Sequence, residues 1–227
     1  MNKTHLAIFC DFDGTVARRD VGYHLYRHFS GGRNEALLPD WKAGRLSTRD
    51  CMRLESEMVR ATPQQIDNFL DQFELDPTFA EFTRLCADAG VPVVIVSEGL
   101  DLYIRRLLLR AGLDQVSFRS NIAHLENGGI RIEFPYPFRI CPGCGNCKAA
   151  RIEEFRRAAG ETCRVVFVGD GYSDACGARA ADIVFAKKDL MAYCDSEKIA
   201  YNVFGDFKDV SSRLIQQGLL VLKRESG

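Results

Sequence analysis

Two aspartates, Asp11 and Asp13, stand two residues apart directly after the short apolar segment 5–10. On an extended backbone, residues at i and i+2 point to the same side, so both carboxylates can face one site. One can attack an electrophile while the other donates and accepts a proton, provided that their surroundings separate their pKa values. Alone, the pattern is equally typical of a turn, because Asp13 precedes Gly14.

A carboxylate that attacks a phosphomonoester needs help, because the substrate is itself an anion. A cation removes the repulsion and takes the charge that develops on the phosphoryl oxygens. Asp170 and Asp174 follow the apolar segment 164–168 and supply further oxygen atoms. Oxygen ligands of this kind suit Mg²⁺. The sequence therefore predicts that Asp11, the backbone carbonyl of Asp13, and Asp170 hold Mg²⁺.

Three further groups are suited to binding a phosphoryl group. Ser97 and the backbone amide of Gly99 follow the apolar segment 91–96, and Lys148 opens a predicted helix. A hydroxyl and an amide donate hydrogen bonds, and an ammonium neutralises charge. Taken singly, Ser97 is more typical of a helix N-cap and Lys148 of a solvated helix residue. Their combination with the aspartates, each at a strand end or a helix start, is hard to explain as turns.

The predicted elements place these residues at one edge of a sheet. Buried strands are predicted at residues 5–10, 91–96, 164–168, 183–186 and 201–204, and helices at 76–89, 100–111, 148–159 and 206–223. Strands that alternate with helices predict an α/β fold with a Rossmann-like parallel sheet covered on both faces. Ligands bind such sheets at the carboxyl ends of the strands, where the polar residues lie.

Two segments depart from this alternation. Residues 117–134 alternate in polarity around Asn127-Gly128-Gly129, which predicts a hairpin. Residues 21–75 show no strand pattern and read as several short helices. We therefore expect a core domain of residues 1–16 and 77–227 and an all-helical cap domain of residues 17–76, inserted after the first strand.

Composition narrows the class of protein. The chain has 227 residues and a net charge of -1, which gives no electrostatic reason to expect a nucleic-acid or membrane partner. No apolar run approaches the roughly 20 residues that span a bilayer. The start of the sequence lacks the pattern of a secretory signal, and its nine cysteines are an odd number. We expect a reduced, cytoplasmic protein; a homodimer is left open.

Three cysteines cluster as Cys141-Pro-Gly-Cys144-Gly-Asn-Cys147, directly before Lys148. They can ligate zinc if a fourth ligand, such as His124 or Cys163, completes the site. They can equally form one reversible disulfide or remain unligated thiols in a tight loop. The sequence leaves these alternatives open.

Four motifs in order resemble the haloacid dehalogenase-like superfamily of aspartyl-nucleophile phosphatases. They are Asp11-Phe-Asp13-Gly-Thr, Ser97-Glu-Gly99, Lys148 and Gly169-Asp170-Gly-Tyr-Ser-Asp174. The resemblance implies that Asp11 is the nucleophile and that Asp13 is the general acid and base. It also implies that Asp11, Asp13 and Asp170 hold Mg²⁺, that Ser97 and Lys148 bind the phosphoryl group, and that Asp174 supports the metal and the lysine.

The helical insertion resembles the cap of the phosphoserine phosphatase-like subgroup. Asp20 and Arg53 stand at positions that in phosphoserine phosphatases bind the substrate ammonium and carboxylate. The alternative is that Asp20 caps the helix that begins at Val21 and that Arg53 lies on a solvated face. The cysteine-rich segment is similar instead to the methionine-salvage 2-hydroxy-3-keto-5-methylthiopentenyl-1-phosphate phosphatases and to phosphocholine/phosphoethanolamine phosphatases. The expected partner is thus a small phosphomonoester, either an enediol or ketose phosphate or phosphoserine.

Two other functions compete with this interpretation. A phosphotransferase or mutase would use the same residues and pass the phosphoryl group to a sugar hydroxyl. A zinc-stabilised interaction protein would keep the core without activity, although no catalytic residue is missing. The aromatic residues of the cap, which include Tyr23, Tyr26, Phe29, Trp41 and Phe69, are predicted to form its core and not a cage for a quaternary ammonium group.

Overall fold

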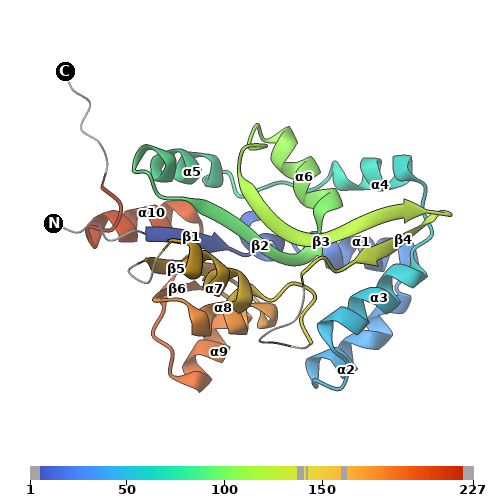
Figure 1. The fold of residues 1–227 in the computed structure, drawn as a ribbon. Coiled ribbons are helices and arrows are strands. Elements are labelled where there is room, and N and C mark those ends of the chain that lie inside the picture. Colours follow the sequence, from blue (N-terminus) through green and yellow to red (C-terminus); the bar gives the residue numbers. More distant parts are fainter. Residues whose placement is uncertain (1–5, 137–140, 142, 160–162, 222–227) are drawn as a thin grey trace.

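The computed structural model describes residues 6–136, 141, 143–159 and 163–221. Its centre is a seven-stranded sheet in the order β4-β3-β2-β1-β5-β6-β7 (Figure 1). The strands are Leu6–Cys10 (β1), Val93–Leu100 (β2), Ser117–Glu126 (β3), Gly129–Glu133 (β4), Arg164–Gly169 (β5), Ile183–Ala186 (β6) and Asn202–Val203 (β7). Every neighbouring pair is parallel except the hairpin β3–β4. The predicted α/β class and parallel core are confirmed.

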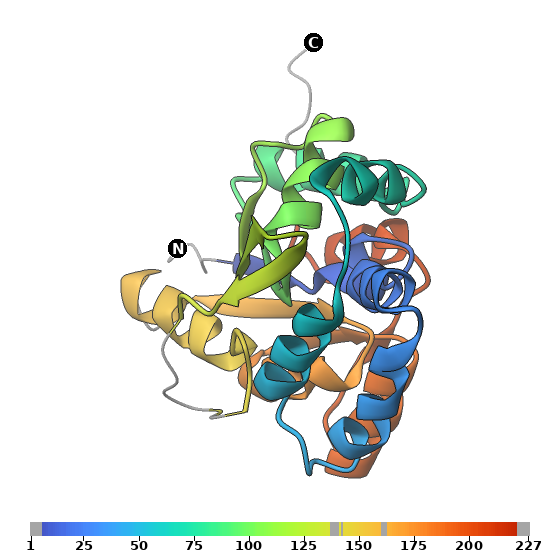
Figure 2. The same ribbon diagram turned by 90° about the vertical axis from the view of Figure 1, so that its right-hand side faces the viewer.

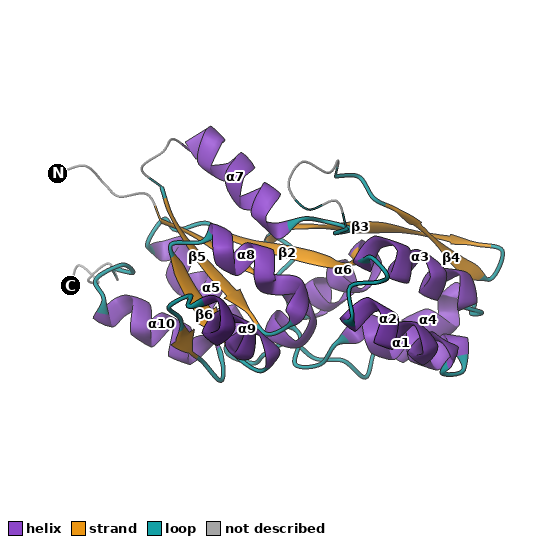
Figure 3. Ribbon diagram, turned by 90° about the horizontal axis from the view of Figure 1, so that it is seen from below, coloured by secondary structure: helices purple, strands orange, loops and turns teal. Residues whose placement is uncertain are grey.

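Helices cover both faces of the sheet (Figure 3). They are Phe79–Asp88 (α5), Asp101–Arg110 (α6), Lys148–Ala159 (α7), Ala175–Ala180 (α8), Asp189–Glu197 (α9) and Phe207–Gln216 (α10). Successive residues of β1 serve opposite faces: Ile8 packs in the cluster that holds Phe82 of α5, and Phe9 in the cluster that holds Ile152 of α7. This alternation is the period of a strand that is buried on both sides.

The cap consists of short helices between β1 and α5. They are Val21–Ser30 (α1), Leu38–Lys42 (α2), Thr48–Met58 (α3) and Pro63–Leu70 (α4), with a 3₁₀ turn at Arg33–Leu37. They lie beyond the end of the sheet toward which β1 runs, and they face the viewer in Figure 2. The predicted helical insertion after the first strand is thus confirmed.

Two connections join the cap to the core. The chain enters and leaves the cap side by side, because Ala17 pairs with Leu75 in an antiparallel bridge and Asp76 N donates to Val16 O at 2.8 Å. The β3–β4 hairpin reaches the cap from the other side, where Ala61 N donates to Gly128 O at 2.8 Å. These contacts support our proposal that the cap domain comprises residues 17–76.

Some predicted boundaries differ from the structure. β2 continues to Leu100, past the predicted end at residue 96. Its pairing with β3 shifts register after Val96 and resumes at Leu100. Helix α10 ends at Gln216, before a left-handed Gly218, whereas the prediction ran to residue 223; residues 222 and 223 lie outside the described part. Helices α8 and α9 were not predicted.

The packing of α8 on β5 leads to a test. A methyl group added at Gly177 in α8 would lie 2.6 Å from the ring of Phe167, which is fully buried in β5. We expect Gly177→Ala to destabilise the fold by about 1–3 kcal/mol, because overpacking outweighs the gain in helix propensity. Urea unfolding measures the change. Gly171→Ala is the control, since no atom lies within 4 Å of its added carbon. Equal stability of the two variants would contradict this packing.

Candidate active site

The first two aspartates lie where β1 leaves the sheet. Asp11 N still donates to Val168 O of β5 at 2.9 Å, and the chain then forms one irregular helical turn, Phe12–Val16. Within it Gly14 has φ +79°, and a side chain there would collide with the carboxylate of Asp170. Glycine thus lets the loop after β1 approach the loop after β5.

Hydrogen bonds fix both carboxylate oxygens of Asp13. Oδ1 accepts from Val21 N at 2.8 Å and from Gly22 N at 3.2 Å, at the start of α1, and Oδ2 accepts from the hydroxyl of Tyr103 at 2.8 Å. Burial raises the pKa of Asp13 to about 7, with a further contribution from Asp20, although these hydrogen bonds oppose the shift. Asp13 can therefore exchange a proton near neutral pH.

Lys148 is the cation at the centre of the site, and it is completely buried. Its Nζ donates to Asp11 Oδ1 at 2.7 Å, to Ser173 Oγ at 3.3 Å and to Asp174 Oδ1. Burial lowers the pKa of Lys148, but the charges of Asp11 and Asp174 raise this pKa by more, so that the net shift is upward. The ammonium stays charged and is held between the loops that follow β1 and β5.

Asp170 and Asp174 complete an acidic cluster beside the lysine. The second oxygen of Asp174 accepts from the backbone amides of Asp170 and Gly171 at 2.8 and 2.9 Å, which fixes the loop. Ligand oxygens of Asp11, Asp170 and Asp174 lie within 4.8 Å of one another. Burial raises the pKa of Asp11 well above its usual range, and Asp174 adds to the shift more than Lys148 opposes it. The cluster thus has the ligands and the surplus charge that suit a divalent cation.

The predicted phosphate-binding groups of β2 face the same region. Ser97 is buried, and its Oγ accepts from Gly99 N at 2.8 Å. A side chain at Gly99 would collide with the hydroxyl of Tyr103, so the close approach of α6 requires glycine. Asn146 donates to Ser97 O at 3.0 Å and to Arg119 O at 2.9 Å, which ties the loop before Lys148 to β2 and β3.

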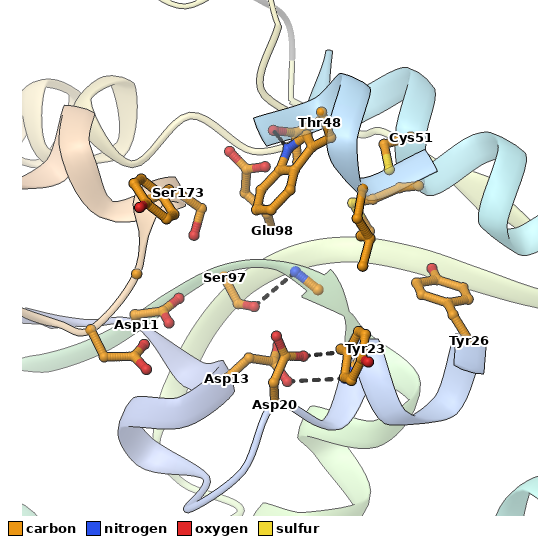
Figure 4. A pocket seen from close by; sticks show the side chains of 18 of the residues that line it. Asp11, Asp13, Asp20, Tyr23, Tyr26, Thr48, Cys51, Ser97, Glu98 and Ser173 are labelled. Carbon is orange, nitrogen blue, oxygen red and sulfur yellow. Dashed lines mark hydrogen bonds between the residues drawn. The ribbon is translucent and has the colours of Figure 1, made fainter. Parts of the chain in front are cut away.

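A cavity of about 470 Å³ lies between these groups and the cap. Its core end includes Asp11, Asp13, Ser97, Gly99, Asp170 and Ser173, and its cap end includes Tyr23, Tyr26, Leu38, Trp41, Met52 and Glu55. Figure 4 shows Asp11, Asp13 and Ser97 at one side of this space and Tyr26 and Cys51 at the other. The size is that of a site for a small molecule.

The structure separates the two residues predicted to bind an amino-acid substrate. Asp20 lines the cavity, where burial raises its pKa, and its side chain also caps α1 by accepting from Tyr23 N at 2.8 Å. Arg53 points away: it is exposed, lies 3.5 Å from Asp50, and does not line the cavity. The structure thus gives Arg53 a solvated position, the alternative that the sequence left open, because the opposite face of α3 meets the cavity.

The cap aromatics also divide into two groups. Tyr23, Tyr26 and Trp41 line the cavity. Tyr26 is also buried in the hydrophobic core, as predicted, whereas Tyr23 and Trp41 are not part of it. Phe29 and Phe69 fit the prediction better, since they pack against each other and against His28.

The cysteine cluster has a fourth member that the sequence did not suggest. All nine cysteines are free thiols, and the sulfurs of Cys141, Cys144, Cys147 and Cys176 lie within 4.8 Å of one another. The two ligands proposed from the sequence lie elsewhere: His124 pairs with Glu133 at 2.9 Å, and the thiol of Cys163 faces Arg164 O. Cys176 belongs to α8 and carries no sequence signal of its own.

Three other residues of the site were missed. Tyr103 and Asn146 act through contacts that only the tertiary structure creates. Lys188 lines the cavity and donates to Asp170 at 2.8 Å. Its position just after β6, at the same edge as the aspartates, is a signal that could have identified it.

Known proteins resemble this chain over nearly its whole length. The family model of the haloacid dehalogenase-like hydrolases matches residues 8–179. A 2-hydroxy-3-keto-5-methylthiopentenyl-1-phosphate phosphatase of Brevibacillus brevis is 28% identical over 216 residues, 93% of this chain and 96% of the relative. The enzyme of the same name from Geobacillus thermodenitrificans is 30% identical, with the same coverage.

The fold is also that of a solved phosphatase. A structure described as a phospho-aspartyl intermediate analogue of phosphoserine phosphatase superposes with a TM-score of 0.70 and 17% identity, covering 93% of this chain and 99% of its own. No described helix combines the length and the apolar character needed to cross a membrane. On the family match and these relatives, the chain belongs to the haloacid dehalogenase-like hydrolases and is a phosphatase.

Proposed function

We propose that the protein hydrolyses a small phosphomonoester through a phosphoaspartate on Asp11. One observation carries this proposal: the Asp11 carboxylate is held by the ammonium of Lys148 at 2.7 Å, and the nearby Asp13 has a pKa of about 7. Two carboxylates two residues apart therefore have different partners: the ammonium of Lys148 at Asp11, and backbone amides and the hydroxyl of Tyr103 at Asp13. Asp11 can attack phosphorus, while Asp13 can protonate the leaving oxygen and then deprotonate the attacking water.

The described residues fit a magnesium ion. Oxygens of Asp11, Asp170 and Asp174 converge within 4.8 Å, and the glycine at position 14 lets the carboxylate of Asp170 approach the loop after β1. We assign the ion to Asp11, Asp170 and the backbone carbonyl of Asp13, with Asp174 holding the loop and Lys148. When bound, Mg²⁺ would offset the charge of the phosphoryl oxygens.

The remaining groups bind the phosphoryl oxygens. Ser97 Oγ lies next to the amide of Gly99, and both line the cavity. Lys148 does not line the cavity, but its ammonium donates to Asp11. A hydroxyl, an amide and an ammonium near Asp11 suit a phosphoryl group during transfer.

The cap end of the cavity favours a substrate with an uncharged tail. Leu38, Trp41 and Met52 line it, and among the described lining residues there is no arginine. Among the described residues of the cap that line the cavity, the cationic one is Lys42, which is exposed. The buried Glu55 would repel a substrate carboxylate when ionised. We therefore propose a ketose or enol phosphate with an apolar tail, the class to which the substrate in the name of the two relatives belongs.

A second substrate class is favoured by one arrangement. Tyr23, Tyr26 and Trp41 line the cavity together with Glu55, and aromatic rings beside a carboxylate can hold a quaternary ammonium group. A phosphocholine-like substrate is the alternative.

Trapping the intermediate tests the mechanism. We expect Asp13→Asn to accumulate a phosphoenzyme from an aryl phosphate, whose leaving group needs little protonation, because the second step lacks its base. Intact-mass spectrometry should show one added phosphoryl group. Asp11→Asn is the matched control and should show none, with activity below about a hundredth of wild type. Absence of the adduct in Asp13→Asn would contradict the assigned roles, and phosphate release by wild type without an acceptor distinguishes hydrolysis from transfer.

The rates of hydrolysis of several phosphomonoesters test the proposal that the substrate has an uncharged tail. We expect kcat/KM for a methylthio ketose phosphate to exceed that for phosphoserine by about a hundredfold, because a buried carboxylate would lack a partner. Arg53→Ala should leave every substrate unchanged. A selective loss of phosphoserine hydrolysis in Arg53→Ala would restore the amino-acid interpretation, and a preference for phosphocholine that Glu55→Gln abolishes would favour the second class.

Glu55 also makes the stability of the folded protein depend on pH. Burial raises its pKa from 4.5 to about 7, against the hydrogen bond that it accepts from Asn34. Between these pH values the folded state holds more protons than the unfolded state, so stability falls as pH rises. We expect Glu55→Gln to flatten this fall by at most about 3 kcal/mol.

Urea unfolding at several pH values measures this effect. Glu57→Gln, an exposed change on the same helix α3, is the control and should keep the wild-type slope. The assignment fails if Glu55→Gln keeps that slope as well.

A further inference from the structure

Four thiols from two segments meet beside the catalytic lysine. Cys141, Cys144 and Cys147 come from the loop before α7, and Cys176 from the first turn of α8. Their sulfurs lie within 4.8 Å of one another. Helices α7 and α8 lie side by side in Figures 1 and 3, so the cluster sits where two segments distant in sequence come together.

The spacing of the sulfurs fits a single metal ion. Zinc bonded to four sulfurs at about 2.3 Å sets the sulfurs about 3.8 Å apart in a tetrahedron. The observed limit of 4.8 Å accommodates this tetrahedron, whereas a disulfide would join the sulfurs in pairs, and all of these cysteines are free. Sulfurs this close leave room for one ion and not for a cluster of several irons.

The surroundings have the character of a closed structural site. Cys147 and Cys176 are buried, and Cys141 and Cys144 are half-buried. The thiols of Cys144 and Cys176 already contact the sulfur of Cys147 as hydrogen-bond donors. Four protein ligands leave no open position, which is typical of structural zinc.

We propose that Cys141, Cys144, Cys147 and Cys176 bind one zinc ion as a tetrathiolate, which ties the loop before α7 to α8. Binding displaces the thiol protons to solvent, and no oxidant is needed.

The position of this ion relates it to catalysis. Cys147 directly precedes Lys148, and Cys176 stands two residues after Asp174, whose carboxylate accepts from Lys148. The ion would therefore join the two segments that hold this ion pair. The apolar packing here consists of small side chains, Ala149, Ala150 and Ala180, and is a weak substitute for four metal–sulfur bonds. Zinc is thus a positioning element for Lys148.

Metal analysis tests the site without reference to activity. The full chain, produced without a metal-affinity tag in zinc-containing medium and dialysed against EDTA, should keep about one zinc ion per chain. Cobalt incorporated in its place should show the charge-transfer bands of thiolate ligands in a tetrahedral field. Wild-type protein without zinc, with iron in its place, or with a disulfide among these cysteines would overturn the proposal.

Two matched variants test the fourth ligand. Cys176→Ser should lower the zinc content severalfold, whereas Cys163→Ser, which alters another buried thiol that lies outside the cluster, should keep about one ion. Equal zinc content in both variants would remove Cys176 from the site. The measurements on wild-type protein decide the proposal even if Cys176→Ser fails to fold.

Inhibition by inorganic phosphate tests the positioning role, which rests on the proposed function. Removing zinc should weaken phosphate inhibition and lower kcat, each by about tenfold, with the Mg²⁺ dependence unchanged. If the removal of zinc changes only the thermal stability, zinc binds the cluster but does not position Lys148. Failure of the phosphoaspartate mechanism would appear separately, as a missing phosphoenzyme in a protein that still binds zinc.

Discussion

The buried ammonium of Lys148 is the constraint on which the rest of the site depends. It has no exposed surface, and Asp11 and Asp174 accept its hydrogen bonds. A charge so far from water is tolerable only when its partners are in place, and removing one partner leaves an uncompensated buried charge. The loops after β1 and β5 and the start of α7 must therefore meet with little freedom. The central position of β1, between β2 and β5, makes this meeting possible.

The burial of Lys148 also explains why the neighbouring carboxylates of Asp11 and Asp13 have different surroundings. Four aspartates, Asp11, Asp13, Asp170 and Asp174, gather at this edge, and Lys148 and Lys188 do not balance their charge when all four are ionised. Asp11 lies inside this cluster. Asp13 is turned out of it toward Tyr103 and the start of α1, in a buried position beside Asp20. Asp11 thus shares the field of Lys148 and of the acidic cluster, whereas burial raises the pKa of Asp13 to about 7.

The sequence predicted the parts of the site that depend on local order. Asp11, Asp13, Asp170 and Lys148 stand at strand ends or a helix start, and parallel strands bring such positions to one edge. It could not predict contacts that depend on how elements pack. Cys176 joins the other cysteines only because α8 packs against α7. The sequence predicted a helix from near residue 100. It gave no sign that β2 stays paired with β3 beyond Ser97, after the irregularity between Val96 and Leu100.

Arg53 shows how the packing of the cap determines which side chains line the cavity. Along a helix each residue turns by about 100°, so Arg53 lies nearly opposite Cys51 and Glu55, which line the cavity. Helix α3 packs on β4, and the hydrogen bond from Ala61 to Gly128 at the hairpin tip fixes the chain just beyond it. The rotation that turns Met52 and Glu55 inward and Arg53 outward is therefore set by the hairpin, an element of the core. The packing of the hairpin against the cap thus determines which side chains of α3 line the cavity opposite Asp11, Asp13 and Asp170.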